Sequence, residues 1–239
     1  MSRRSAAWAA ALALAGCGGA SGDGESAVVF SAASLAAVAA AVDPGATVVA
    51  GGSNDLAAQI RDGARADVFL SASAAPLREL RSAGLVRAPV PIASNRLVVV
   101  VPRANPAEIM TLADLTRPGT KLVLGAAGVP VGDYAREALT AAGAGDALAN
   151  VVSLEDDVKG VVGKVVLGEA DAGVVYATDV RAAGDRVAVV AVPAAVQPEI
   201  RYFAAATESG GARAEAYLER LLGAAGAVAL REGGFLPLR

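Results

Sequence analysis

The sequence predicts an α/β fold in which short apolar strands alternate with amphipathic helices along nearly the whole chain. Segments such as Asp67–Leu70 and Leu97–Val101 are almost continuously apolar, as strands buried on both faces are. Between such strands, segments such as Asp55–Asp62 have the apolar spacing of a helix. The chain has 239 residues, of which 54% are hydrophobic and 19% charged, so it can bury a sizeable core.

The predicted elements follow one another in regular alternation. Strands are expected at Ala27–Ala32, Thr47–Ala50, Asp67–Leu70, Leu97–Val101, Leu122–Gly125, Ala172–Tyr176, Val187–Val192 and Ile200–Ala206. Helices are expected at Leu35–Val42, Asp55–Asp62, Ala75–Ala83, Thr111–Leu115, Asp133–Ala142, Asp156–Leu167 and Ala212–Ala225. Strands separated by helices imply parallel βαβ units with helices on both faces of a sheet.

A weak internal repeat indicates two similar lobes. In each half a helix is followed by a glycine and then by an aspartate that opens a strand: Gly63 and Asp67 in the first half, Gly168 and Asp171 in the second. Each glycine is expected to end its helix in the left-handed conformation. Each aspartate is expected to be structural, accepting hydrogen bonds from local backbone N–H groups.

The first residues read as an export signal. Arg3 and Arg4 precede the apolar run Ala6–Ala15, which is too short to span a bilayer. The sequence Leu14-Ala15-Gly16-Cys17 resembles a bacterial lipobox, and Cys17 is the only cysteine. We therefore expect a lipoprotein signal peptide at 1–16, lipidation of Cys17 and a flexible linker at 17–26. The alternative is an ordinary secretory signal with an incidental cysteine.

Composition excludes several classes of function. The chain contains no histidine, which removes Ser-His-Asp catalysis and histidine-based metal sites. A net charge of −3 argues against a nucleic-acid partner, since such partners usually require a basic face. An exported serine hydrolase using Ser34 or Ser53 stays a weak alternative, because the sequence offers no base for it. A lipoprotein with only an adhesive or structural role is a further alternative.

Several strand ends offer hydrogen-bond donors without a cationic side chain. Ser34 and Ser53 stand before predicted helices, where each is either a helix cap or a donor to a ligand. Val131 and Val158 lie at the starts of helices and offer only backbone N–H groups. Tyr176 ends an apolar strand, where its phenol is either a core group or a donor into a crevice. Helix N-termini that converge in this way favour a small oxyanion.

The ordered motifs resemble those of the molybdate-binding proteins of bacterial ABC importers. The motifs are Phe30-Ser31-Ala32-Ala33-Ser34-Leu35, Leu56-Ala57-Ala58-Gln59-Ile60, Gly63–Ala72, Val129–Ala135, Glu155–Val158, Gly168–Asp179 and Gly233-Gly234-Phe235. The resemblance covers almost all of the chain from about Val28 onward. Two departures are a first helix about two turns shorter and Arg65 in place of a usual proline.

The resemblance implies a two-lobed type II periplasmic-binding-protein fold with a ligand cleft between the lobes. Lobe 1 would comprise residues 27–98 plus 200–239, and lobe 2 residues 99–199. By resemblance the oxyanion ligands are Ser34, Ser53, Val131, Val158 and Tyr176, the two valines acting through backbone N–H. The metal would be bound as molybdate or tungstate at these same residues, with no cofactor and no catalytic residue.

The resemblance further implies an extracytoplasmic protein that acts as a monomer, is held to a membrane through Cys17, and passes its ligand to a permease and its ATPase. Neutral donors in a fixed cavity would select by size, so sulfate should bind far worse than molybdate, and tungstate about equally well. No acid is expected at the donor positions to accept the proton of phosphate. The same fold binding another oxyanion, such as sulfate, is the main alternative.

Overall fold

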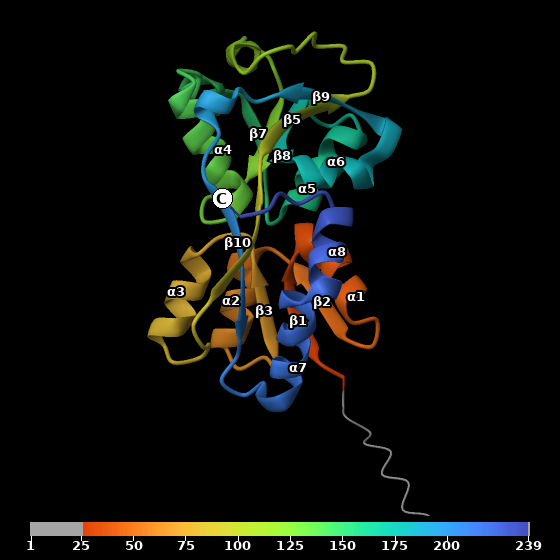
Figure 1. The fold of residues 1–239 in the computed structure, drawn as a ribbon. Coiled ribbons are helices and arrows are strands. Elements are labelled where there is room, and N and C mark those ends of the chain that lie inside the picture. The colour runs from red at the N-terminus through yellow and green to blue at the C-terminus, as the bar shows by residue number, and fades with distance from the viewer. Residues whose placement is uncertain (1–25, 239) are drawn as a thin grey trace, which may run out of the picture.

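The computed structural model describes residues 26–238, which form two lobes, each built on a five-stranded sheet (Figure 1). The first sheet has the order β2-β1-β3-β10-β4. Its strands are β1 (Val28–Ala32), β2 (Thr47–Gly51), β3 (Val68–Ser71), β4 (Val90–Asn95) and β10 (Ile200–Ala206). Its helices are α1 (Ala36–Val42), α2 (Ser53–Arg61), α3 (Ala75–Ser82), α7 (Gly211–Leu222) and α8 (Ala224–Glu232).

The second sheet repeats the arrangement with the order β7-β6-β8-β5-β9. Its strands are β5 (Leu97–Pro102), β6 (Leu122–Gly125), β7 (Val151–Glu155), β8 (Ala172–Tyr176) and β9 (Val187–Ala191). Its helices are α4 (Pro130–Ala141), α5 (Val158–Val166) and α6 (Ala177–Ala183). Short 3-10 turns lie at Ala33–Leu35, Ala113–Thr116, Gly145–Asn150, Gly184–Arg186 and Ala194–Val196. The α/β prediction is thus confirmed.

The sheets are mixed rather than wholly parallel. In the first sheet β1 pairs in parallel with β2 and β3, whereas β10 runs antiparallel to β3 and β4. In the second, β6 is parallel to β7 and β8, whereas β5 is antiparallel to β8 and β9. The antiparallel members are the strands by which the chain crosses between lobes. The chain leaves the first sheet at Arg96, between β4 and β5, and returns between β9 and β10.

Alternating side chains of the strands reach opposite faces of the first sheet. Val29 packs with Val38 and Tyr217 on the face covered by α1, α7 and α8. Phe30 packs instead with Leu56 and other apolar residues of α2 and α3. Figure 1 shows these two groups of helices on either side of the lower lobe. Covering both faces of the strands buries β3 completely.

The two aspartates of the internal repeat hold equivalent positions. Asp67 Oδ2 accepts a hydrogen bond from Val28 N at 2.8 Å, at the start of β1. Asp171 Oδ2 accepts one from Lys121 N at 2.8 Å, just before β6. The glycines before them, Gly63 and Gly168, have φ values of 95° and 73°. Both aspartates are therefore structural, and the repeat is real.

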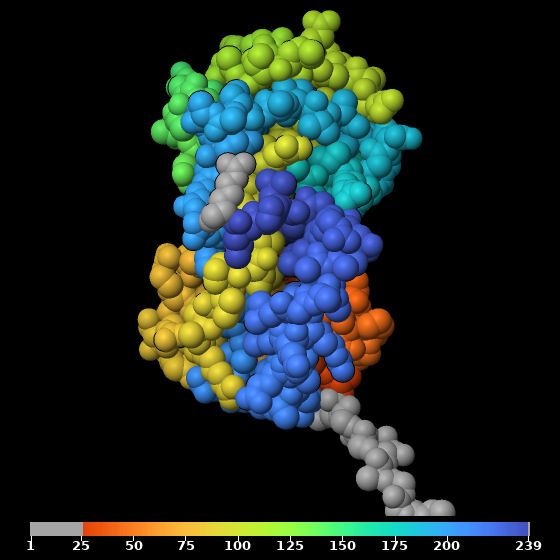
Figure 2. Space-filling model, viewed as in Figure 1, coloured from red at the N-terminus to blue at the C-terminus, as the bar shows by residue number. Residues whose placement is uncertain are grey.

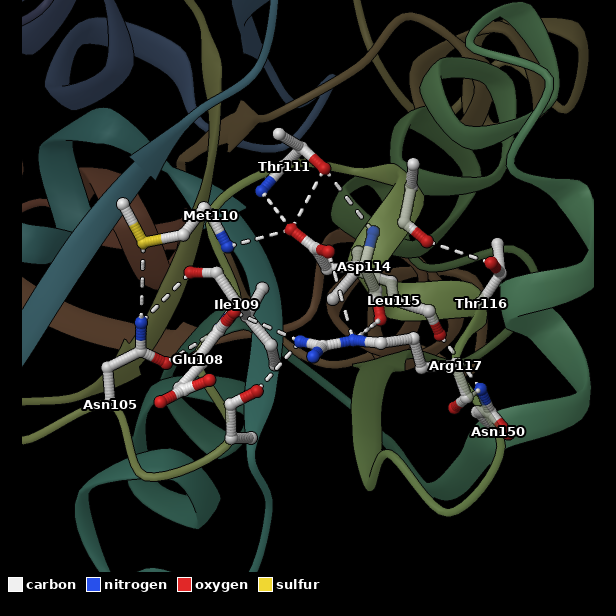
Figure 3. Close-up of polar contacts among 12 residues, drawn as sticks. Asn105, Glu108, Ile109, Met110, Thr111, Asp114, Leu115, Thr116, Arg117 and Asn150 are labelled. Atoms are coloured by element: carbon white, nitrogen blue, oxygen red, sulfur yellow. Dashed lines mark hydrogen bonds and ion pairs between the residues drawn. The ribbon is translucent and has the colours of Figure 1, made fainter.

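The long connection from β5 to β6 is fixed by its own polar contacts (Figure 3). Asp114 Oδ2 accepts hydrogen bonds from the N–H groups of Met110 and Thr111 at 3.0 and 2.8 Å. The Arg117 guanidinium donates to Ala107 O and Glu108 O at 2.7 and 3.0 Å. The bonds from Met110 and Thr111 hold the pKa of Asp114 below its usual range. Together with the Arg117 bonds they keep this connection, which has no sheet pairing, in one shape.

The C-terminal segment packs against β4 and β10 at the waist between the lobes. Ser94 and Leu236 exchange backbone hydrogen bonds, and the Phe235 ring lies 5.0 Å from that of Tyr202, edge to face. Figure 2 shows the dark blue C-terminal residues lying across this waist beside β10. No helix within residues 26–238 is long and apolar enough to cross a membrane.

Candidate oxyanion site between the lobes

A small cavity lies between the two sheets, where the carboxyl ends of their parallel strands face each other. Its volume is about 20 Å³, whereas one water needs roughly 10–15 Å³. It is lined by Ala32, Ala33, Ser34, Gly51, Gly52, Ser53, Ala72, Val129, Pro130, Val131, Asp157, Val158 and Tyr176. All five residues predicted as ligands line this one cavity, two from the first lobe and three from the second. The space suits a compact solute and excludes a sugar or peptide.

The two serines are held by partners other than their own helices. Ser34 lies in a 3-10 turn before α1, and its Oγ donates to Tyr202 Oη at 3.2 Å. Ser53 is the first residue of α2, and its Oγ accepts from Ala72 N at 3.1 Å. Neither side chain caps a helix in the structure, so the capping alternative for both residues was wrong. Because Ser53 accepts from Ala72, its own hydrogen is left to point elsewhere.

Val131 and Val158 offer backbone donors at the starts of two helices. α4 begins at Pro130, a residue suited to the first helical position because its missing N–H would have no helical partner. Val131 follows it, and Val158 is the first residue of α5. N–H groups in a first turn have no partner within the helix. Asp157 caps α5 by accepting from Gly160 N at 2.9 Å, and Val158 lines the cavity beside it.

Tyr176 carries a buried hydroxyl that has no hydrogen-bond partner within residues 26–238. Its Oη is buried and makes no hydrogen bond with the described residues. Burial raises the pKa of Tyr176 well above its usual value, and the neighbouring Tyr202 and Tyr134 raise it further. The phenol therefore stays protonated and can donate. A buried polar atom normally has a partner, so an unpaired hydroxyl in a cavity wall is available to donate to a ligand.

The charges around the cavity are negative rather than positive. None of the described residues that line it is Lys or Arg, and Asp157 belongs to the lining. No acidic residue was predicted in the cavity wall from the sequence, because Asp157 was interpreted only as part of a helix start. Further out, Asp55 of α2 faces Asp156 and Asp157 of the other lobe, and burial together with these two charges raises its pKa.

The lobes touch at the rim of the cavity. A Cβ built on Gly52 would lie 2.2 Å from the backbone oxygen of Asp156, so only a glycine permits this approach. A glycine pair such as Gly51-Gly52 allows close backbone contact with a ligand. In the structure Gly52 also allows close contact between the two lobes.

Two buried residues behind the cavity were missed by sequence reasoning. Tyr202 of β10 bonds Ser34 and packs its ring edge to face against Tyr176, with ring centroids 5.6 Å apart. Asn95, the last residue of β4, donates to Tyr202 Oη at 3.2 Å. Only the crossing of two strands far apart in sequence brings them here, and nothing local in either segment signals it.

Comparison with known proteins agrees with this architecture. A family model described as bacterial extracellular solute-binding protein matches residues 27–236. The molybdate-binding protein ModA of Mycobacterium tuberculosis is 36% identical over 220 residues, which cover 87% of this chain and 83% of that protein. The molybdate-binding protein ModA of Escherichia coli is 32% identical over 247 residues, which cover 95% of each.

Solved structures share the fold. The periplasmic molybdate-binding protein of Azotobacter vinelandii superposes with a TM-score of 0.76 at 21% identity, covering 89% of this chain and all of that one. The sulfate-binding protein SubI of Mycobacterium tuberculosis gives a TM-score of 0.72 at 20% identity, covering 89% of this chain and 87% of that one. At these identities the likeness concerns the fold alone, so it does not choose between the two anions.

Proposed function

This chain belongs to the bacterial extracellular solute-binding proteins, and on that basis we propose that it captures molybdate between its lobes for an ABC importer. The observation that carries the proposal is the convergence on one small cavity of two hydroxyls from the first lobe with two helix starts and an unpaired phenol from the second. The names of its sequence relatives, both molybdate-binding proteins, support the same ligand. Its role is binding rather than catalysis, as in those relatives.

The proposed ligands are Ser34, Ser53, Val131, Val158 and Tyr176. A dianion that leaves water must have its oxygens bonded again, and a hydrogen bond to a charged group contributes about 1.5–3 kcal/mol. Helix starts add favourable dipoles without a counter-charge. Selection then depends on size and donor count, because a smaller anion leaves donors unpaired. Tungstate, which is nearly the same size, is expected to bind as well, and sulfate far less.

Phosphate is the more demanding competitor because Asp157 lies in the wall. Near neutral pH phosphate keeps a proton, and a carboxylate oxygen could accept it. One oxygen of Asp157 is already bonded to Gly160 N. The negative charge of the carboxylate opposes phosphate as it opposes every other anion in the cavity.

The hydrolase alternative finds no support in the site. The hydroxyls of Ser34 and Ser53 contact Tyr202 and the Ala72 N–H, respectively, and neither partner is a general base at neutral pH.

We propose that the mature chain is anchored through Cys17, outside the described residues, and passes its ligand to a membrane permease with its ATPase. The Leu14–Cys17 lipobox supports the anchor. The chain is proposed to act as a monomer at the outer face of the cell membrane or in the periplasm.

Calorimetric titration tests the ligand. The chain from Ser21 onward, which retains every strand and helix of both lobes, would be titrated with molybdate, tungstate, sulfate and phosphate. Tight one-to-one binding of molybdate and tungstate, with little heat from the others, is expected. Tighter binding of sulfate, or no heat with molybdate, would overturn the assigned ligand and leave the fold in place.

A further inference from the structure

We infer that Tyr202, held by Asn95, is a positioning residue that turns the Ser34 hydroxyl hydrogen toward the bound anion. The inference deepens the proposed function and rests on it. Tyr202 is fully buried and does not line the cavity. It nevertheless touches a proposed ligand of each lobe, Ser34 through a hydrogen bond and Tyr176 through its ring.

Asn95 has its amide orientation fixed on three sides. Its Oδ1 accepts from Arg96 N at 2.9 Å. Its Nδ2 therefore faces Thr178 Oγ1 at 3.0 Å and Tyr202 Oη at 3.2 Å, and an amide NH₂ has two hydrogens to give. Thr178 belongs to α6 of the second lobe, whereas Tyr202 belongs to β10 of the first sheet. Asn95 thus ties the two lobes together at the crossing point.

The bond from Asn95 restricts what the Tyr202 hydroxyl can do. A phenol has one hydrogen to donate, and Asn95 occupies one of its acceptor positions. Ser34 Oγ, 3.2 Å away, can accept that hydrogen once Ser34 donates its own hydrogen elsewhere. Burial, followed by the charge of Asp179, raises the pKa of Tyr202 well above its usual value, so the hydrogen is retained.

The pair can therefore exist in two arrangements. In the cavity as it stands, Ser34 Oγ donates to Tyr202 Oη. When an anion oxygen takes the Ser34 hydrogen, Ser34 Oγ is left with free acceptor capacity, and the Tyr202 hydrogen turns to fill it. Each hydroxyl then donates toward the anion, and a hydrogen bond received by Ser34 strengthens the one that it gives. Within this pair of side chains, only the two hydroxyl hydrogens need to rotate.

A double-mutant cycle tests this coupling. Tyr202→Phe removes the hydroxyl and keeps the ring contacts with Tyr176 and Phe235. We expect it to weaken molybdate binding roughly tenfold, with a similar loss for Ser34→Ala. Because the two hydroxyls act as one unit, the double variant should bind no more than about twofold worse than Ser34→Ala alone. If the affinity losses of the two single variants multiply in the double variant, Tyr202 has a merely structural role and the inference is overturned.

Tyr217→Phe is the matched control. Tyr217 is equally buried, and its hydroxyl donates to Ala39 O at 3.0 Å, remote from the cavity lining. It should lose thermal stability and keep the parent affinity. If Tyr202→Phe does not fold, Asn95→Leu replaces it. That variant frees the Tyr202 hydroxyl and should weaken binding about threefold, so parent affinity would overturn the inference.

The parent protein separates the two proposals. Molybdate binding by the parent, with Tyr202→Phe unaffected, would overturn the positioning role alone. Absence of molybdate binding by the parent would overturn the proposed function and this inference with it.

Discussion

Among the proposed ligands, Ser53 has the hydroxyl hydrogen that is most clearly available to donate to an anion. Its oxygen accepts from the Ala72 N–H, so the hydroxyl hydrogen has to point away from that backbone. We expect Ser53→Ala to weaken molybdate binding by roughly 10- to 100-fold, since it removes one hydrogen bond to a charged group and leaves the Ala72 N–H unpaired. Calorimetry measures the loss. Ser82→Ala, at the exposed end of α3, should bind as the parent does.

Asp179 is expected to make the protein less stable as the pH rises. Burial raises its pKa to about 7, and its Oδ2 is buried without a hydrogen bond among the described residues. An acid whose pKa is raised by folding stabilises the fold less as pH rises, here between about 4 and 7. Over this range the free energy of unfolding decreases by on the order of 4 kcal/mol. We expect Asp179→Asn to exceed the parent in free energy of unfolding at pH 8 and to match it near pH 4, by urea denaturation.

Asp67 is a control for Asp179, because its effect on stability is expected to change with pH in the opposite direction. Burial would raise its pKa, but the bonds from Arg213 and Val28 N, together with the Arg213 charge, outweigh burial and hold the pKa below its usual range. Its stabilisation is present above the unfolded pKa and is lost as pH falls through the folded one. Asp67→Asn should therefore be less stable than the parent at pH 8, with a gap that narrows in acid. Parallel pH trends in the two variants would contradict both assignments.

At the scale of elements, Gly52 decides how closely α2 approaches the loop before α5. Its φ of −63° is open to any residue, so alanine costs no backbone strain. Within the first lobe the added Cβ would lie 3.2 Å from Asn54 Oδ1 and from Asp55 Oδ2, which belong to side chains that can shift. A Cβ there would lie 2.2 Å from Asp156 O and hold the lobes apart. We expect Gly52→Ala to weaken molybdate binding at least tenfold with little change in thermal stability. Small-angle scattering with ligand should show incomplete closure.

Gly163→Ala is the control for that substitution. Gly163 lies within α5, and a Cβ at this position meets nothing within 4 Å. Alanine in a helix interior stabilises by roughly 0.5–1 kcal/mol relative to glycine, so this variant should be slightly more stable and bind normally. Normal binding by Gly52→Ala as well would mean that the contact with Asp156 is not needed for the bound state.

The strands and helices were predictable where the apolar pattern was uninterrupted. Leu97–Val101 was predicted as a buried strand and Leu122–Gly125 as a strand, and both form buried strands. β7 was missed because its outward side chains, Val152 and Leu154, are exposed at a sheet edge and its inward ones are short or polar. β4 was missed because it contains a proline, which is uncommon in strands.

Helix boundaries were less predictable than helix existence. The segment Ala212–Ala225 was expected to be one helix, yet the chain breaks at Gly223 into α7 and α8. α6 was missed because it follows β8 with no loop between them. The candidate ligands were predictable because each stands at a strand or helix end. Tyr202 and Asn95 were not, since their role arises only from the crossing of β4 and β10.

At the scale of the molecule, like charges face each other across the cavity rim where the two lobes touch. Asp55 rises from the first lobe, and Asp156 and Asp157 from the second. Their proximity raises the pKa of Asp55 after burial does so, which means that the ionised carboxylate opposes the closed arrangement. A bound dianion adds further negative charge between the lobes. The donors of the cavity must therefore overcome this repulsion as well as hold the anion.

Neutralising that rim should tighten binding. We expect Asp55→Asn to bind molybdate about two- to fivefold more tightly than the parent at low ionic strength, because one like-charge contact across the lobes is removed. At roughly 1 M salt the Debye length falls to about 3 Å, so the difference should disappear. Asp62→Asn, just after the same helix, controls for the change in net charge and should leave the affinity unaltered. Equal affinities for Asp55→Asn and the parent at low salt would show that repulsion between these carboxylates does not oppose closing of the lobes. Hydrogen bonding to the anion alone would then set the balance between open and closed forms.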